Sequence, residues 1–197
     1  MNCVFCNIDK SRPENTIIEG SENFIVIPSI GALVDGYLMI VSKKHINSMS
    51  ELKENEKIEY ELLIKKYRNK FKKIYNKFPI IFEHGSPINN SDMKASSVIH
   101  AHTHIVNHKF IDENLVIKKL NFKKLDNLNY LSRKQNYIMY RKKKNICYIS
   151  YNFEPTSQMM RKIIAKELGY ENKFDWKKEM FIENINSTIK RFKNGSD

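Results

Sequence analysis

This sequence contains no long apolar run, although 41% of its 197 residues are hydrophobic. No segment approaches the roughly 18 uninterrupted apolar residues that a transmembrane helix needs, so we expect no membrane span and no membrane partner. The N-terminus, MNCVFCNI, also lacks the basic region, apolar stretch and cleavage site of a secretory signal peptide. We therefore expect a cytoplasmic protein.

Cysteine is scarce as well, with three in the chain. An odd number without a signal peptide argues against a disulfide framework. Cys147 lies in an apolar run, residues 146–149, and is predicted to be a small buried hydrophobe. Cys3 and Cys6 form a C-x-x-C pair that suits a tetrahedral zinc ion, which needs two further ligands, or a redox pair. Its place at the extreme N-terminus, not between a strand and a helix, disfavours the redox use.

Acidic residues are outnumbered, with 22 Asp and Glu against 34 Lys and Arg, for a formal net charge of +12. Such an excess permits polyanionic partners, including nucleotides and nucleic acids. The lysines are scattered along the whole chain, as a solvated surface would leave them. The charge therefore permits nucleic-acid binding without indicating it.

Repeats, low-complexity tracts and Pro/Gly-rich linkers are also absent. Short β-rich runs between turn residues predict an antiparallel meander with strands at residues 16–19, 24–27, 37–41, 80–83 and 98–106. A capping box at Ser48 and Glu51 predicts the start of a long amphipathic helix that Pro79 stops. After residue 110 we expect a hairpin of residues 136–140 and 146–151 and two helices, at 157–168 and 181–192. The fold class is α+β, with a catalytic domain over 1–110 and an extension over 111–197 packed on it.

The run HAHTHIV at residues 100–106 contains three of the six histidines of the chain. A strand alternates its side chains, so His100, His102 and His104 are predicted to project from one face. Packing explains them poorly, because each buried neutral imidazole requires hydrogen-bond partners. A metal site fits this arrangement, and so does nucleophilic or acid–base catalysis near neutral pH.

Taken together, these motifs resemble the histidine-triad (HIT) family, in its order and at about its spacing. The matching segments are CVFCNI at 3–8, FIVIPSIGALVDGYLMIVSKKHINSMSEL at 24–52 and HAHTHIV at 100–106. The FEHG at 82–85 and the later PTSQMMRKIIAKELG and FDWKKE are similar to a branch with a C-terminal extension. The resemblance implies a five-stranded antiparallel sheet with a long helix, to which the extension adds strands and helices.

The resemblance also implies a structural zinc ion bound by Cys3, Cys6, His45 and His100. Four protein ligands leave no open position for an activated water. His102 would be the nucleophile that forms a covalent nucleotidyl-histidine, with its Nδ1–H donating to a backbone carbonyl. His104 would help to polarise the phosphate oxygens.

A nucleoside would occupy an apolar slot in this family, and plain core packing is an equally good explanation of each matching residue. The positions that match are Val4, Phe5, Ile8, Ile27 and Ile30. Ser29 stands where the family has an acidic residue for the ribose hydroxyls, and Ser96 replaces a glutamine of the A-G-Q segment. We hypothesise that Ser96 and Ser97 donate hydrogen bonds to phosphate.

Several further polar residues are assigned less directly. His84 is expected to line the site, whereas His108 is predicted to be a surface residue. Ser157, Gln158 and Arg161 resemble a recurring pattern of the branch. Arg161 is interpreted as a helix-surface residue, with a contact to phosphate as the alternative.

The function expected from the resemblance is that of a nucleotide hydrolase or nucleotidyltransferase acting at an α-phosphate. Its substrates would be dinucleoside polyphosphates, nucleoside phosphoramidates or adenylylated adducts. The altered Ser29 and Ser96 favour an alternative, a non-catalytic nucleotide-binding or protein-interaction module on the same scaffold. Nucleic-acid binding ranks third, and a homodimer is expected because many members of the family form one.

Overall fold

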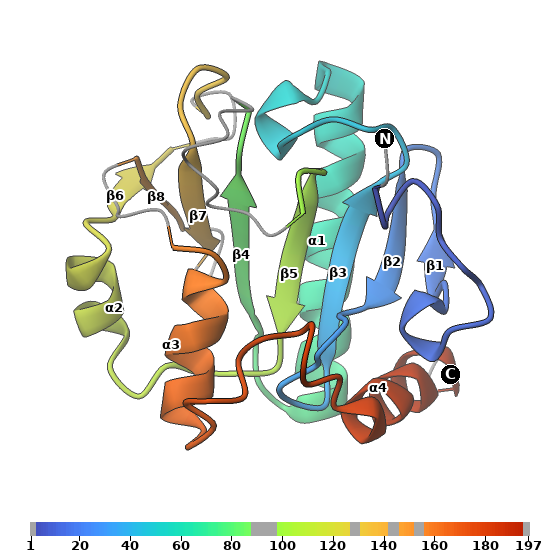
Figure 1. Cartoon of the computed structure of the whole chain (residues 1–197). Coiled ribbons are helices and arrows are strands. Elements are labelled where there is room, and N and C mark those ends of the chain that lie inside the picture. The colour runs from blue at the N-terminus through green and yellow to red at the C-terminus, as the bar shows by residue number, and fades with distance from the viewer. Residues whose placement is uncertain (1–2, 88–97, 127–130, 142–145, 152–155, 195–197) are drawn as a thin grey trace.

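One antiparallel sheet organises the computed structural model, which describes residues 3–87, 98–126, 131–141, 146–151 and 156–194 (Figure 1). Within these ranges the sheet has eight strands in the order β1-β2-β3-β5-β4-β7-β8-β6. The strands are β1 (Glu19–Gly20), β2 (Phe24–Pro28), β3 (Tyr37–Ser42), β4 (Ile80–Gly85), β5 (His102–Val106), β6 (Lys123–Leu125), β7 (Tyr137–Arg141) and β8 (Cys147–Ser150).

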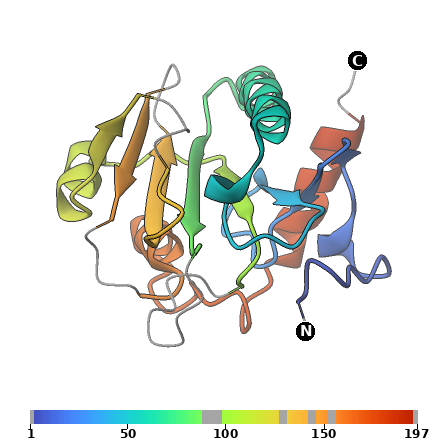
Figure 2. The ribbon, with the colours of Figure 1, turned by 90° about the horizontal axis from the view of Figure 1, so that it is seen from above.

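Helices cover both faces of this sheet. The described helices are the short 3-10 turns η1 (Pro13–Asn15) and η2 (Met49–Glu51), and the α-helices α1 (Glu54–Tyr75), α2 (Glu113–Lys119), α3 (Met159–Glu167) and α4 (Ile182–Asn194). Seen from above, α1 lies on one face and α3 on the other (Figure 2). None of the described helices is long and apolar enough to cross a membrane.

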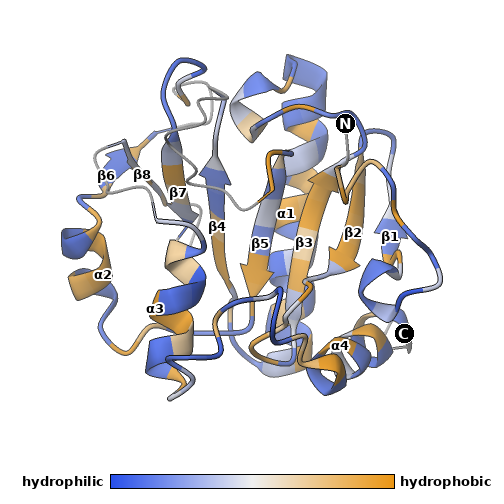
Figure 3. Cartoon of the chain, in the orientation of Figure 1, coloured by the Kyte–Doolittle hydropathy of each residue, from blue (hydrophilic) through white to orange (hydrophobic). Residues whose placement is uncertain are grey.

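The alternation of side chains along the strands builds a core on each face, and β2 and β3 are hydrophobic along most of their length (Figure 3). Ile81 and Ile105 pack toward α1, in a cluster with Tyr60 and Phe71 of that helix. Phe82, one residue from Ile81, packs instead in the cluster that contains α3. One face of β5, the strand with His102 and His104, therefore packs against α1.

The predicted five-stranded sheet is present as β1 to β5, and three strands of the extension continue it. β7 pairs antiparallel with β4, so that Gly85 lies opposite Tyr137. A Cβ atom on Gly85 would lie 2.1 Å from the Tyr137 ring, so the ring can lie over this position only because residue 85 has no side chain. The predicted hairpin is confirmed, since β7 and β8 pair antiparallel; its turn, residues 142–145, lies outside the described residues.

The long helix begins and ends at other residues than predicted. The capping box of Ser48 and Glu51 exists, but it caps the short helix η2. α1 starts afterwards, where the Glu56 carboxylate accepts a hydrogen bond from the backbone N–H of Lys53 at 2.7 Å. It ends at Tyr75 because Asn76 adopts a left-handed conformation (φ 53°), before Pro79 is reached.

Two other predictions needed correction. The first strand contains only Glu19 and Gly20, and the histidine strand β5 starts at His102 and not at residue 98. His100 therefore precedes the strand, in a turn where its N–H donates to the Val98 carbonyl at 3.1 Å. The helices near 157–168 and 181–192 are confirmed as α3 and α4, whereas α2 and β6 had no clear periodic signal.

Candidate metal centre and active site

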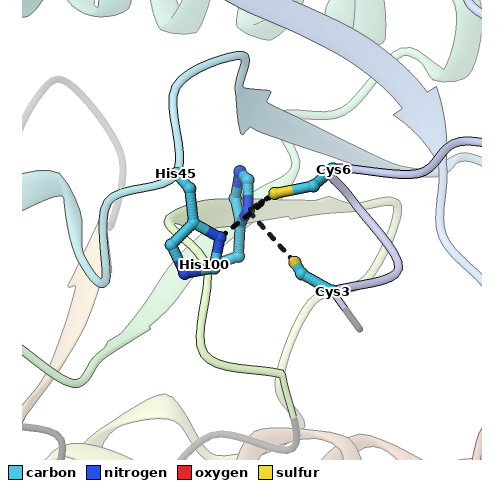
Figure 4. Close-up of side chains that lie close together, drawn as sticks. All are labelled: Cys3, Cys6, His45 and His100. Atoms are coloured by element: carbon cyan, nitrogen blue, oxygen red, sulfur yellow. Dashed lines mark hydrogen bonds between the residues drawn. The ribbon is translucent and has the colours of Figure 1, made fainter. Parts of the chain in front are cut away.

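Cys3, Cys6, His45 and His100 come together from three separate segments, the N-terminus, the loop after β3 and the turn before β5 (Figure 4). Their four ligand atoms all lie within 4.8 Å of one another. Nδ1 of His100 is 3.3 Å from Sγ of Cys3 and 3.6 Å from Sγ of Cys6, and Nδ1 of His45 is 3.1 Å from Sγ of Cys6. A tetrahedral zinc ion with two sulfur and two nitrogen ligands needs edges of roughly 3.5 Å. The spacing and the donor set therefore fit such an ion.

The orientation of the His100 ring is set by a backbone carbonyl. Its Nε2 lies 2.7 Å from the carbonyl oxygen of Ser42, which can only accept, so Nε2 carries the proton. Nδ1 is then unprotonated and available as a ligand. This second hydrogen bond is the usual support of a metal-binding histidine.

His102 is held in the same way, with its two nitrogens exchanged. Nδ1 lies 2.6 Å from the carbonyl oxygen of His100, so the proton is on Nδ1 and the lone pair is on Nε2. The side chain is only 8% exposed, and burial lowers its pKa to about 4. At neutral pH His102 is therefore a neutral imidazole whose free nitrogen is Nε2.

His104 lies beside His102 on the same face, with ring centroids 4.9 Å apart. Its ring stacks on that of Phe82 at 4.6 Å, because the two residues are direct partners across β4 and β5. Its Nδ1 is 3.2 Å from the hydroxyl of Tyr37. Loss of hydration lowers the pKa of His104 well below its ordinary value, and the neighbouring His102 and His84 lower it further. His104 is therefore also neutral near pH 7.

His102 and His104 line a pocket of about 540 Å³, a volume that includes its open mouth. Its described lining is Val4, Phe5, Ser29, Ile30, Met39, Phe82, His84, Val98, His102, His104, Gln158, Arg161 and Trp176. The wall is mostly apolar; its polar side chains are the three imidazoles, one arginine, Ser29 and Gln158. Such a lining suits a ligand with a flat apolar part and a charged part.

The structure places four of the eight expected substrate-binding residues in this wall. Val4, Phe5, Ser29 and Ile30 line the pocket. Ile8 and Ile27 are absent from its lining and pack in a hydrophobic cluster with Cys3 and Phe5. Ser96 and Ser97 lie outside the described residues.

Two side chains that were assigned to the surface are buried. Arg161 is 4% exposed and lines the pocket, because α3 packs on the same face of the sheet as His102. His108 is 8% exposed, and its Nε2 lies 2.8 Å from the carboxylate of Glu167 on α3. Both surface assignments were wrong for one reason, which is that the extension packs against the sheet and buries side chains on both sides of that contact.

Met39, Phe82, Val98, Gln158 and Trp176 were not expected in the pocket. The alternation along β3 and β4 offered a signal for the first two, because Met39 and Phe82 are both direct partners of His104. Trp176 is the only tryptophan of the chain and lies in the FDWKKE segment, far from the triad in sequence.

Comparison with known protein families identifies the family of this chain. Residues 2–120, more than half of the chain, match the family model described as "Scavenger mRNA decapping enzyme C-term binding". No curated protein matches the chain.

Solved structures of histidine-triad proteins are also similar to it. A HIT family member from Bacillus subtilis is 21% identical, over 54% of this chain and 72% of its own, with a TM-score of 0.44. A HIT family hydrolase from Clostridium thermocellum is 27% identical, over 56% and 94%, with a TM-score of 0.41. A zinc-bound histidine triad family protein from Mycobacterium smegmatis is 19% identical, over 57% and 79%, with a TM-score of 0.43. By its family-model match, this chain belongs to the HIT-like family of the scavenger decapping enzyme C-terminal domain, and so to the histidine-triad proteins.

Proposed function

We propose that this chain is a nucleotide hydrolase or nucleotidyltransferase in which His102 attacks the α-phosphorus of a nucleotide. The observation that carries this proposal is the 2.6 Å hydrogen bond between Nδ1 of His102 and the His100 carbonyl. It leaves an unprotonated Nε2 on a side chain that lines the pocket. A neutral imidazole positioned in this way is an activated nucleophile without a separate base.

The reaction then proceeds in two displacements. Nε2 forms a bond to phosphorus while the bond from phosphorus to the leaving group breaks, and the electron pair goes to the leaving group. The positive charge that develops on the imidazole is stabilised by the carbonyl of His100, to which Nδ1–H donates. Water or another acceptor then attacks the phosphorus while the bond from phosphorus to Nε2 breaks. The electron pair of that bond returns to Nε2, the proton of the acceptor passes to the leaving group or to solvent, and His102 is restored as the nucleotide is released.

His104 has a supporting role in this proposal. The pKa of the Tyr37 hydroxyl is raised by burial, so Tyr37 keeps its proton. If the hydroxyl donates to Nδ1 of His104, the proton of that neutral ring is on Nε2. Nε2–H of His104 then donates to a phosphate oxygen as negative charge grows there.

The ligands of the proposed zinc ion are Cys3, Cys6, His45 and His100. An ion bound there would supply structural crosslinking, because all four positions are taken by protein. His100 would then join the metal centre to the catalytic strand, since its carbonyl orients His102. We assign the extension over 111–197 to the same functional unit as residues 1–110, because Gln158, Arg161 and Trp176 complete the pocket.

The experiment is to incubate the purified protein with dinucleoside polyphosphates and with adenine and guanine phosphoramidates, and to follow mononucleotide release. His102→Ala should lose about 10⁴-fold or more of the turnover. His108→Ala is the matched control, because it removes a buried imidazole that pairs with Glu167 outside the pocket. It should lower stability and preserve turnover per folded molecule.

Equal turnover by wild type and His102→Ala would refute the assignment of His102 as the nucleophile. Negligible turnover by the wild type on the whole panel, with nucleotide binding intact, would favour the binding module. The altered Ser29 is the observation behind that second candidate, because its buried hydroxyl donates to the Ile30 carbonyl at 3.2 Å.

A further inference from the structure

Arg161 is a buried cation whose hydrogen bonds are incomplete. Its Nε donates to the carbonyl of Phe174 at 3.0 Å, and its Nη2 donates to the carbonyl of Gly31 at 2.6 Å. Nη1 is fully buried and has no hydrogen-bond partner within the described ranges. The two carbonyls fix the plane of the guanidinium, so that the remaining N–H groups are presented in one orientation.

No described carboxylate compensates this charge. The salt bridges of the described residues do not include Arg161, and its neighbours in the pocket wall contain no Asp or Glu. Arg161 is the one lysine or arginine among the described wall residues, so it carries their fixed charge. A buried charge without a counterion is destabilising, and a bound anion would offset that cost.

Arg161 lies next to Tyr37, which in turn contacts His104. Its Cζ lies 5.6 Å from the centre of the Tyr37 ring, and the hydroxyl of Tyr37 contacts His104. Gln158, on the same side, accepts a hydrogen bond from the backbone N–H of Trp176 at 3.3 Å and donates to Asp175 at 2.9 Å. The extension thus brings an arginine and an indole to the pocket as one connected wall.

We propose that Arg161 binds the phosphate group of the nucleotide, so that the extension supplies the anion recognition of this site. The inference rests on the proposed function for the identity of the ligand, a nucleoside monophosphate unit, but not on turnover. A planar guanidinium with free N–H groups is well matched to phosphate oxygens. Arg161 is in this view a substrate-binding residue, in addition to its contacts with Gly31 and Phe174.

The test uses the intrinsic fluorescence of Trp176, the only tryptophan of the chain and a pocket residue. The metal-loaded full chain is titrated with AMP and adenosine, with GMP and guanosine, and with inorganic phosphate. The ratio of the nucleoside Kd to the nucleotide Kd measures the contribution of the phosphate. In Arg161→Met this ratio should fall by roughly tenfold to a hundredfold, with the nucleoside Kd nearly unchanged, because hydrogen bonds to charged groups contribute that much.

Arg133→Met is the matched control, because Arg133 also binds two backbone carbonyls, those of Ser50 and Leu52, but does not line the pocket. It removes the same charge and should leave the ratio unchanged. If circular dichroism shows that Arg161→Met is unfolded, Arg161→Lys is used in its place. This variant keeps the positive charge but loses the planar guanidinium, so the ratio should fall by less than in Arg161→Met.

Three results would overturn the proposal. One is a wild-type protein that does not prefer the nucleotide over the nucleoside. Another is a ratio that stays constant in folded Arg161 variants while both affinities weaken equally, which is the signature of a purely structural role. The third is an equal fall of the ratio in Arg133→Met. If the wild type prefers the nucleotide through Arg161 but shows no turnover on the substrate panel, the proposed function is refuted and the role of Arg161 stands.

Discussion

Glu83 makes the stability of this protein depend on pH in an unusual direction. The carboxylate is fully buried on β4, where it accepts hydrogen bonds from the backbone N–H of Met49 at 2.7 Å and from the Tyr137 hydroxyl at 3.0 Å. Burial raises its pKa from 4.5 to about 7, although both hydrogen bonds and the charge of Arg141 act the other way. The folded protein therefore binds a proton at this site where the unfolded chain does not.

The sign and the size of the effect follow from linkage. Because the folded pKa of Glu83 is the higher one, its contribution to stability is complete below pH 4.5 and is lost as the pH rises to about 7. A difference of about 2.5 pKa units corresponds to about 3 kcal/mol of unfolding free energy. Glu83→Gln has no such proton, and its amide oxygen can still accept from Met49. From pH 4 to pH 8, the unfolding free energy of the variant should therefore rise by about 3 kcal/mol relative to that of wild type.

Urea unfolding of both proteins at half-unit steps of pH measures this difference. The buried histidines have lowered pKa values, so protonation destabilises the fold in acid, but this effect is common to both proteins and cancels. A difference that is flat over the range, or that falls as pH rises, would refute the role of Glu83.

Three other perturbations test the packing and the metal centre. Gly31→Ala should cost at least about 1–2 kcal/mol and loosen the extension, since φ is +67° and the new Cβ would lie 2.7 Å from that of Trp176; a wild-type urea midpoint would contradict this. A chelator should lower the Tm of wild type but not that of Cys6→Ser, and wild type without bound metal in elemental analysis would contradict the zinc site. Phe192→Ala should cost about 3–5 kcal/mol, because the side chain is 2% exposed and its ring lies 4.9 Å from that of Phe71; a loss under about 1 kcal/mol would show that α4 contributes little to the core.

Features that depend on local periodicity could be predicted from the sequence. Alternation along HAHTHIV placed His102 and His104 on one face and Ile105 on the other, because a strand turns successive side chains to opposite faces whatever surrounds it. The apolar spacing of α1 and the β7–β8 hairpin were visible for the same reason. The four grouped metal-ligand candidates were identified through the family resemblance, and the structure brings them within reach of one ion.

The ends of the helices and strands, and the second wall of the pocket, depend on tertiary contacts. Whether Ser48 and Glu51 cap a long helix or a short turn depends on where α1 meets the sheet, which the motif does not contain. Arg161 and His108 have the sequence context of solvated residues, yet both are buried. Their partners, the Gly31 carbonyl and Glu167, lie 130 and 59 residues away along the chain. Contacts at such separations arise only when the sheet and the extension pack together, so no local pattern encodes them.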